Sequence, residues 1–143
     1  LTVAIMRAMV VGVNEEVYAV PLSNIVEIIR TDGQMISMVG GAPVMRVRDS
    51  VLPLVNLNDH LGGAMNGASG SIAVIVGLGE RRLALLVTGL FGQEEVVIKP
   101  LEDRLERHPA ISGATIREDG SVSLILDVAA LFKSVEQRPA KAA

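Results

Sequence analysis

The sequence predicts an all-β fold built from two similar small barrels, and two observations lead to this prediction. Short apolar segments recur about every ten residues with turn residues between them, a pattern typical of a barrel or sandwich. The apolar pattern of residues 18–25 also repeats at residues 83–90, and that of residues 51–57 repeats at residues 122–128. A duplicated strand-rich unit whose second copy has one longer loop explains both repeats.

The expected elements of the first copy follow from its apolar segments and turn residues. Strands are expected at 3–13 and 17–20 around a turn at 14–15, a helical turn at 21–24, and strands at 25–29, 44–48 and 51–55. Pro53 donates no ladder hydrogen bond, so its strand should be an edge strand or bulged. We expect a helical turn at 58–62, and the repeats should join near 62–70, which is rich in Gly, Ala and Ser.

The second copy shows the same order of elements. Strands are expected at 71–76 and 82–87 around a turn at 77–80, an apolar segment at 96–98, a helical turn at 101–107, a hairpin at 111–116 and 122–126, and a terminal helical turn at 127–132. The last residues, 136–143, form a polar tail. Because each unit is near the lower size limit for independent stability, we expect the two halves to pack against and stabilise each other.

The composition favours a binding domain over an enzyme. Of the 143 residues, 50% are hydrophobic but only 2% are aromatic. The chain therefore has few side chains on which bases or sugars could stack. The net charge is −3, and Arg81-Arg82 is the nearest approach to a basic cluster, which argues against nucleic acid. The absence of cysteine excludes disulfides and thiolate metal sites and fits the cytosol. No apolar run is long enough to insert into a membrane.

Catalytic and cofactor motifs are weak. Residues 72–79 resemble the first strand and glycine turn of a dinucleotide-binding fold. That fold requires Gly or Ala three residues later, where this chain has Arg82, and a helix, where this chain has a strand-like segment. His60 and His108 are too few for a metal site, and His60 is better interpreted as a solvated turn residue. The acidic pairs 94–95 and 102–103 have no nucleophile or phosphate cradle nearby. We therefore predict no catalytic, cofactor-binding or metal-binding residue.

Asp127 lies between two apolar segments, which allows two interpretations. It could be a carboxylate of raised pKa, or a helix cap. Its counterpart in the first copy is Asn56, and Asn and Asp share the capping role, so the cap is favoured. A small β-barrel hydrolase that uses Asp127 or His60 is the remaining enzyme hypothesis.

Apolar surface is the remaining feature. Two barrels of this size cannot easily bury every aliphatic residue of segments 25–29 and 89–92, so part of them should form a patch for another protein. The alternative is that these residues fill the seam between the barrels. The residues alone leave both interpretations open.

Several motifs resemble the C-terminal regulatory domain of the bacterial chemotaxis histidine kinase CheA, which is homologous to the adaptor CheW. They are LTVAIMRA at 1–8, YAVPL at 18–22, Arg48 with VLPL at 51–54, GQEEVVIKPL at 92–101, SGATI at 112–116 and DGSVSLILD at 119–127. The resemblance runs from Leu1 to about Phe132. It implies a regulatory domain over residues 1–135, made of two intertwined five-stranded SH3-like barrels, followed by the tail at 136–143.

The resemblance also implies a function without catalysis in this chain. ATP binding and phosphotransfer would belong to other domains of the parent kinase. This domain would bind CheW and the cytoplasmic tips of chemoreceptors, as part of a cytoplasmic receptor array. The alternative is a stand-alone CheW-like coupling protein, disfavoured because the chain starts at Leu1 rather than Met and has the kinase-like segment 1–8.

Six residues are predicted to bind partners. They are Ile25, Val26, Ile28, Leu90 and Phe91, with Arg48 as a polar rim or structural residue. The first five lie where apolar segments end near turns, which suits a mostly apolar docking face. The family often has Gly after the arginine, whereas this chain has Asp49, which could alter the turn.

Overall fold

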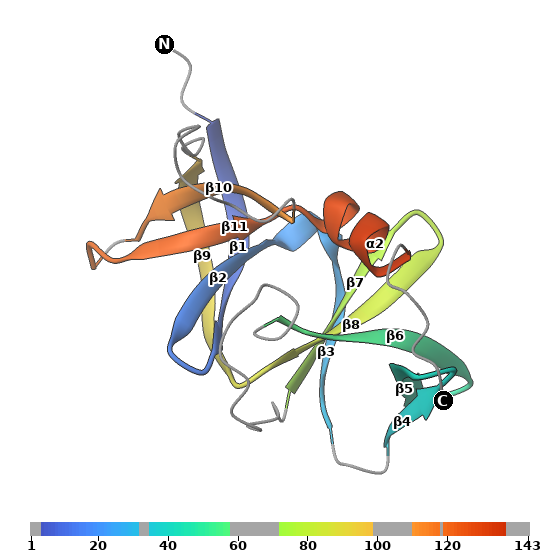
Figure 1. The fold of residues 1–143 in the computed structure, drawn as a ribbon. Helices are drawn as coiled ribbons and strands as arrows, with labels where there is room; N and C mark the ends of the chain where they lie inside the picture. Colours follow the sequence, from blue (N-terminus) through green and yellow to red (C-terminus); the bar gives the residue numbers. More distant parts are fainter. Residues whose placement is uncertain (1–3, 32–34, 58–71, 99–109, 118, 137–143) are drawn as a thin grey trace.

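The protein consists of two β-sheets and a C-terminal helix in the part of the chain that the computed structural model describes, residues 4–31, 35–57, 72–98, 110–117 and 119–136 (Figure 1). One sheet has the order β10 (Ile111–Ile116), β11 (Val122–Leu126), β2 (Glu16–Pro21), β1 (Ala4–Val13), β9 (Gly89–Ile98). The other has the order β3 (Ile25–Arg30), β7 (Ile72–Leu78), β8 (Arg81–Val87), β6 (Ser50–Asn56), β5 (Ala42–Val47), β4 (Ile36–Val39). The short helices are η1 (Leu22–Asn24) and α2 (Val128–Glu136). The all-β prediction is confirmed.

Each sheet takes strands from both halves of the sequence, so the two units are interlocked. Strand β2 pairs in parallel with β11, and Ala19 lies opposite Ile125. Strand β6 pairs in parallel with β8, and Leu54 lies opposite Ala84. The sequence repeats relate Ala19 to Ala84 and Leu54 to Ile125, so the two parallel pairs share one register. This agreement confirms both the duplication and the intertwined arrangement.

The buried residues form three clusters, and the largest lies between the sheets. The six-stranded sheet, here called barrel one, encloses a cluster that includes Met45, Leu54 and Ile75. The five-stranded sheet, barrel two, encloses a smaller cluster of Ala8, Ala19, Val96 and Ile125. The seam cluster contains residues of both sheets and of α2: Val11, Val13, Tyr18, Val20, Val55, Leu57, Val74, Val76, Leu83, Leu85, Val87, Ala110, Ile111, Leu126, Val128, Leu131 and Phe132. The two halves therefore pack against each other through a shared core.

Helix α2 places its apolar side chains in the seam, and Asp127 caps it. The backbone N–H of Ala130 donates to Asp127 Oδ1 at 3.0 Å, which satisfies one of the free donors of the first turn. Val128, Leu131 and Phe132 are the buried side chains of this helix. The helix-cap interpretation of Asp127 is confirmed, and the expected helical turn is a nine-residue helix.

Several strand predictions need correction. Strand β6 is not an edge strand, because it lies between β8 and β5. Pro53 is tolerated there because it faces Val44 of β5, while the pairing with β8 begins only at Leu54. Barrel one has a sixth strand, β4, that the sequence did not reveal; the corresponding stretch of the second copy, residues 106–109, is outside the described part.

The remaining elements were predicted well at their centres and less well at their ends. Strand β7 continues through Gly77 to Leu78, and β9 is a single ten-residue strand across the polar segment 93–95. The helical turns expected at 58–62 and 101–107, the joining loop, His60, His108 and residues 137–143 lie outside the described residues.

Candidate partner-binding surface

The structure divides the six predicted partner-binding residues between the seam and the surface. Ile25 and Ile28 are half-buried and pack against the seam cluster, so the seam interpretation holds for them. Val26, Leu90 and Phe91 are 42%, 38% and 56% exposed. The exposed residues do not share one sheet, because Val26 lies on β3 of barrel one, and Leu90 and Phe91 lie on β9 of barrel two.

Val26 and Phe91 occupy the same position in two equivalent β-bulges. In the pairing of β3 with β7, Ile25 faces Val76 and Glu27 faces Ile75, which leaves Val26 as the extra residue. In the pairing of β9 with β1, Leu90 faces Val11 and Gly92 faces Val10, which leaves Phe91 as the extra residue. A bulge re-aims the side chain of its strand, and here it turns an apolar side chain outward on each barrel.

A glycine supports each of these exposed side chains. A Cβ atom on Gly77 would lie 3.0 Å from Val26 Cγ2, and one on Gly12 would lie 3.0 Å from the ring atoms Cε2 and Cζ of Phe91. The absence of a side chain at both glycines therefore allows the close approach. The repeat that relates Val26 to Phe91 also relates Gly12 to Gly77, so the whole arrangement is duplicated.

Arg48 forms a paired ionic contact with Glu27, the residue after Val26. Its two terminal guanidinium nitrogens donate to Glu27 Oε2 at 2.9 Å and Oε1 at 2.8 Å, a bidentate geometry. These hydrogen bonds hold the pKa of Glu27 below its ordinary value. Arg48 has a φ of 54°, the left-handed region, so the turn before Ser50 is formed by Arg48 itself as well as by Asp49.

Arg82 completes the charged rim of barrel one. It lies opposite Gly77 in the ladder of β7 and β8, and its charge also lowers the pKa of Glu27. Glu27, Arg48 and Arg82 line a small cavity of about 70 Å³ at the barrel mouth, together with Val47, Ser50, Leu52 and Ile75. Two cations around one carboxylate leave this rim with a net positive charge.

The surroundings of Phe91 are different. The Arg117 guanidinium lies 5.6 Å from the centre of the Phe91 ring and donates to Glu94 Oε2 at 3.0 Å. The Arg117 and Glu94 side chains are only 16% and 17% exposed. An arginine at this distance from an aromatic face is attracted to it. Arg117 was not predicted as a site residue, and Glu94 was considered only as part of an acidic pair without a nucleophile or phosphate cradle, because nothing in their local sequence indicates that they meet.

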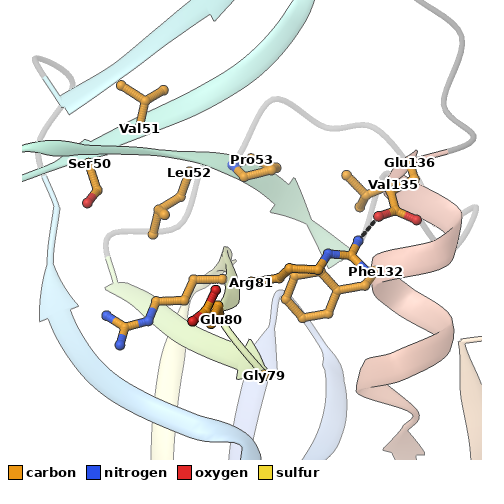
Figure 2. Close-up of a pocket in the computed structure, with 11 residues that line it drawn as sticks. Ser50, Val51, Leu52, Pro53, Gly79, Glu80, Arg81, Phe132, Val135 and Glu136 are labelled. Carbon is orange, nitrogen blue, oxygen red and sulfur yellow. Dashed lines mark ion pairs between the residues drawn. The ribbon is translucent and has the colours of Figure 1, made fainter.

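A groove runs along the junction of barrel one with α2. It has a volume of about 810 Å³ and is lined by β6, by the turn between β7 and β8, and by α2. Figure 2 shows the Arg81 side chain lying across the Phe132 ring and ion-paired with Glu136. The Arg81 guanidinium carbon lies 4.9 Å from the centre of that ring. Val51, Leu52 and Pro53 form the facing wall, and Arg82 joins this groove to the rim described above. The groove was not predicted, because its walls come from distant parts of the chain.

Other site types find little support in the described ranges. They contain no group of three or more His, Cys, Asp or Glu side chains placed to hold a metal. Among the same residues, no helix is long and apolar enough to cross a membrane. The features that the structure does bring together are exposed apolar anchors with charged neighbours, as at protein docking faces.

The chain belongs to the CheW-like domain family, whose pattern matches residues 7–136. It is 44% identical to the sensor histidine kinase CheAY of Helicobacter pylori over 134 residues, which are 92% of this chain and 17% of that protein. It is 45% identical to the chemotaxis protein CheA of Klebsiella aerogenes, covering 92% of this chain and 21% of that protein. The chain thus spans about a fifth of the length of these relatives.

A solved structure has the same fold. The scaffolding protein TtCheW from Thermoanaerobacter tengcongensis superposes with a TM-score of 0.73 over 86% of this chain and 89% of that one, at 18% sequence identity. At this identity the likeness concerns the fold. It confirms the CheW-like arrangement expected from the sequence.

Proposed function

We propose that this chain is the regulatory and adaptor domain of a chemotaxis histidine kinase of the CheA type. In this role it binds the coupling protein CheW and the cytoplasmic tips of chemoreceptors, and it contacts other domains of the parent kinase. ATP binding and phosphotransfer take place in those other domains, and the whole assembly is cytoplasmic and associated with receptor arrays. The identity of about two residues in five to CheA proteins, over nearly all of this chain, supports the proposal.

The observation that carries the binding role is the duplicated bulge. Val26 and Phe91 are apolar, exposed, supported from beneath by a glycine and placed on different barrels. An anchor held rigidly in the free protein loses little conformational entropy when a partner covers it. A partner with barrels of its own can therefore dock on either end, with Val26 or Phe91 at the centre of the contact.

The charged neighbours give each end its own specificity. The Val26 end carries Glu27, Arg48 and Arg82, whereas the Phe91 end carries the nearly buried Arg117–Glu94 pair. Exposed charges at a rim mainly set the association rate and the choice of partner. The two ends therefore select different surfaces even though their backbone geometry is the same.

A stand-alone coupling protein is the second candidate. The superposition on TtCheW covers most of both chains, so this chain is large enough for a complete CheW-like fold. The two functions differ in what accompanies the domain. Sequencing of the reading frame around this chain decides between them, because a kinase carries a phosphotransfer segment and an ATP-binding domain in the same polypeptide.

The binding role is tested with a reconstituted kinase, CheW and receptor assembly. Val26→Asp and Phe91→Asp each place a charge at the centre of one proposed contact and should abolish activation of the kinase by receptors. Ile5→Asp is the matched control, because Ile5 is 64% exposed and faces Val97, six residues along β9 from Phe91. Full receptor control in both bulge variants would refute the assignment of these anchors.

A further inference from the structure

The interiors of the two barrels differ in polarity at four equivalent positions. The sequence repeats and the strand registers relate Ile29, Met45, Val47 and Leu52 of barrel one to Glu94, Thr115, Arg117 and Ser123 of barrel two. The four residues of barrel one belong to its apolar cluster or pack against it. All four counterparts in barrel two are polar.

Two of these polar residues are completely enclosed. Thr115 and Ser123 lie directly opposite each other on β10 and β11, and they are 1% and 0% exposed. Side chains of a cross-strand pair lie on the same face of a sheet, and Ile125, two residues after Ser123, belongs to the barrel-two cluster. Both hydroxyl groups therefore point into the interior of barrel two.

The other two residues close this interior at one end. Arg117 directly follows β10, two residues after Thr115, and its backbone N–H donates to the Ser121 carbonyl oxygen at 2.7 Å. The antiparallel pairing thus continues to Arg117, which places its side chain on the same face as Thr115. Its guanidinium reaches Glu94 on β9, at 3.0 Å, and the pair is mostly shielded from solvent.

Three buried polar atoms in this cluster have no protein partner among the described residues: Thr115 Oγ1, Ser123 Oγ and Arg117 Nε. Buried polar groups are nearly always hydrogen-bonded, because an unpaired one loses its hydration without compensation. The Cβ atoms of a cross-strand pair are about 5 Å apart, and a water molecule between two such hydroxyl groups can hydrogen-bond to both. A buried water needs two to four polar partners, roughly what this cluster offers.

We propose that barrel two contains an internal water-binding site, in which a water molecule bridges Thr115 Oγ1 and Ser123 Oγ. Arg117 Nε is the third polar atom that faces this hydrated interior, and the Arg117–Glu94 pair separates it from solvent. Barrel one has apolar side chains at all four equivalent positions and therefore lacks this site. The proposal concerns the interior of the domain and is independent of its docking partners.

The site is tested by magnetic relaxation dispersion of water, which detects internal water molecules that stay bound longer than the protein tumbles. The unmodified chain should show a long-lived water contribution that is lost in the double variant Thr115→Val, Ser123→Ala. Ser112→Ala is the control and should leave the signal unchanged, because the Ser112 hydroxyl on the same strand already has a protein partner, the Ile125 carbonyl oxygen at 3.4 Å. An equal signal in the double variant overturns the proposal.

A double-mutant cycle gives a second measurement. If one water bridges the hydroxyls, each single substitution should raise the equilibrium constant of unfolding about fivefold, and the double variant should be little worse than either single variant. A lower unfolding constant in the single variants, or effects that simply multiply, overturns the bridge.

If the variants do not fold, a high-resolution crystal structure of the unmodified chain decides. Density for water within hydrogen-bond distance of both hydroxyl oxygens supports the site. A protein group in that place, or no density there, overturns it.

Discussion

Val26 and Phe91, which are 65 residues apart in the sequence, occupy equivalent positions in a duplicated β-bulge. Each is the unpaired residue of its strand, each is exposed, and each lies against a glycine of the neighbouring strand. The two copies share the backbone geometry of the bulge and differ in its side chain, which is small and aliphatic in the first copy and aromatic in the second. The fold therefore presents two related bulges with different exposed side chains, which we propose as docking sites.

The glycine beneath Phe91 should matter more for binding than for stability. Gly12→Ala places a methyl group 3.0 Å from the ring, which must move because the backbone below it cannot. Because Phe91 is 56% exposed, the displaced ring can move into solvent, and we expect a loss of only about 1 kcal/mol in the free energy of unfolding. Affinity for CheW should fall about tenfold, because a pre-positioned aromatic anchor is lost.

Gly89→Ala is the control for this prediction. Gly89 faces Gly12 across the ladder, and an added Cβ there meets nothing within 4 Å. Titrations of CheW with both variants, together with denaturant unfolding, separate the two effects. Unchanged affinity in Gly12→Ala would show that the position of the Phe91 ring is unimportant.

The shared seam predicts that the barrels unfold together. Leu131 is fully buried in the seam cluster, so Leu131→Ala should lower the free energy of unfolding by about 2–5 kcal/mol. Amide hydrogen exchange should show that protection falls in both sheets, since both contribute to this cluster. Val122→Ala, at a position 61% exposed, should have little effect. A variant in which one barrel keeps full protection would contradict a common core.

The cap of α2 should contribute measurably to stability. Asp127→Ala removes the acceptor of the Ala130 N–H and should cost about 1 kcal/mol in denaturant unfolding. Asp127→Asn keeps a capping oxygen and should recover most of this loss, as Asn56 at the equivalent position suggests. Equal losses in the two variants would indicate that the charge of Asp127, rather than its hydrogen bond, stabilises the helix.

Tyr18 should ionise only at unusually high pH. Burial raises its pKa above the ordinary value of 10.0, and the nearby Glu16 carboxylate adds to the effect. Because the folded state favours the neutral phenol, the stabilisation is complete below about pH 10 and is lost as the pH rises through the raised pKa. Tyr18 is the only tyrosine and the chain has no tryptophan, so tyrosinate absorbance reports this residue alone. A midpoint at or below 10 in the folded protein, with the same midpoint in denaturant, would contradict its burial.

Much of the fold could be predicted from the sequence, because strand alternation and turn residues are local signals. The duplication predicted two equivalent sets of elements, and the equivalent registers of Ala19 with Ile125 and Ala84 with Leu54 agree with it. The prediction that Pro53 lies on an edge or bulged strand was wrong, because the sequence does not show where the pairing of β6 with β8 begins. Strand β4 was missed because its four residues are mostly exposed and lack a clear alternation.

The candidate surface was predicted less completely. Apolar segments ending near turns identified Val26, Leu90 and Phe91, but the same rule selected Ile25 and Ile28, which pack into the seam. Whether a residue faces the seam or solvent depends on the bulge, and a bulge depends on register. The ion pairs Arg48–Glu27 and Arg117–Glu94 were missed for a related reason, since 21 and 23 residues separate their members in the sequence.

The most direct test of the docking account is a calorimetric titration of this chain with CheW from the same organism, repeated with Val26→Asp, Phe91→Asp and the Ile5→Asp control. The account predicts saturable binding by the unmodified chain and the control, with the negative heat-capacity change of buried apolar surface. It also predicts a loss of affinity of at least tenfold in one or both bulge variants while both remain folded. No binding at several temperatures, or undiminished binding by both bulge variants, would contradict it.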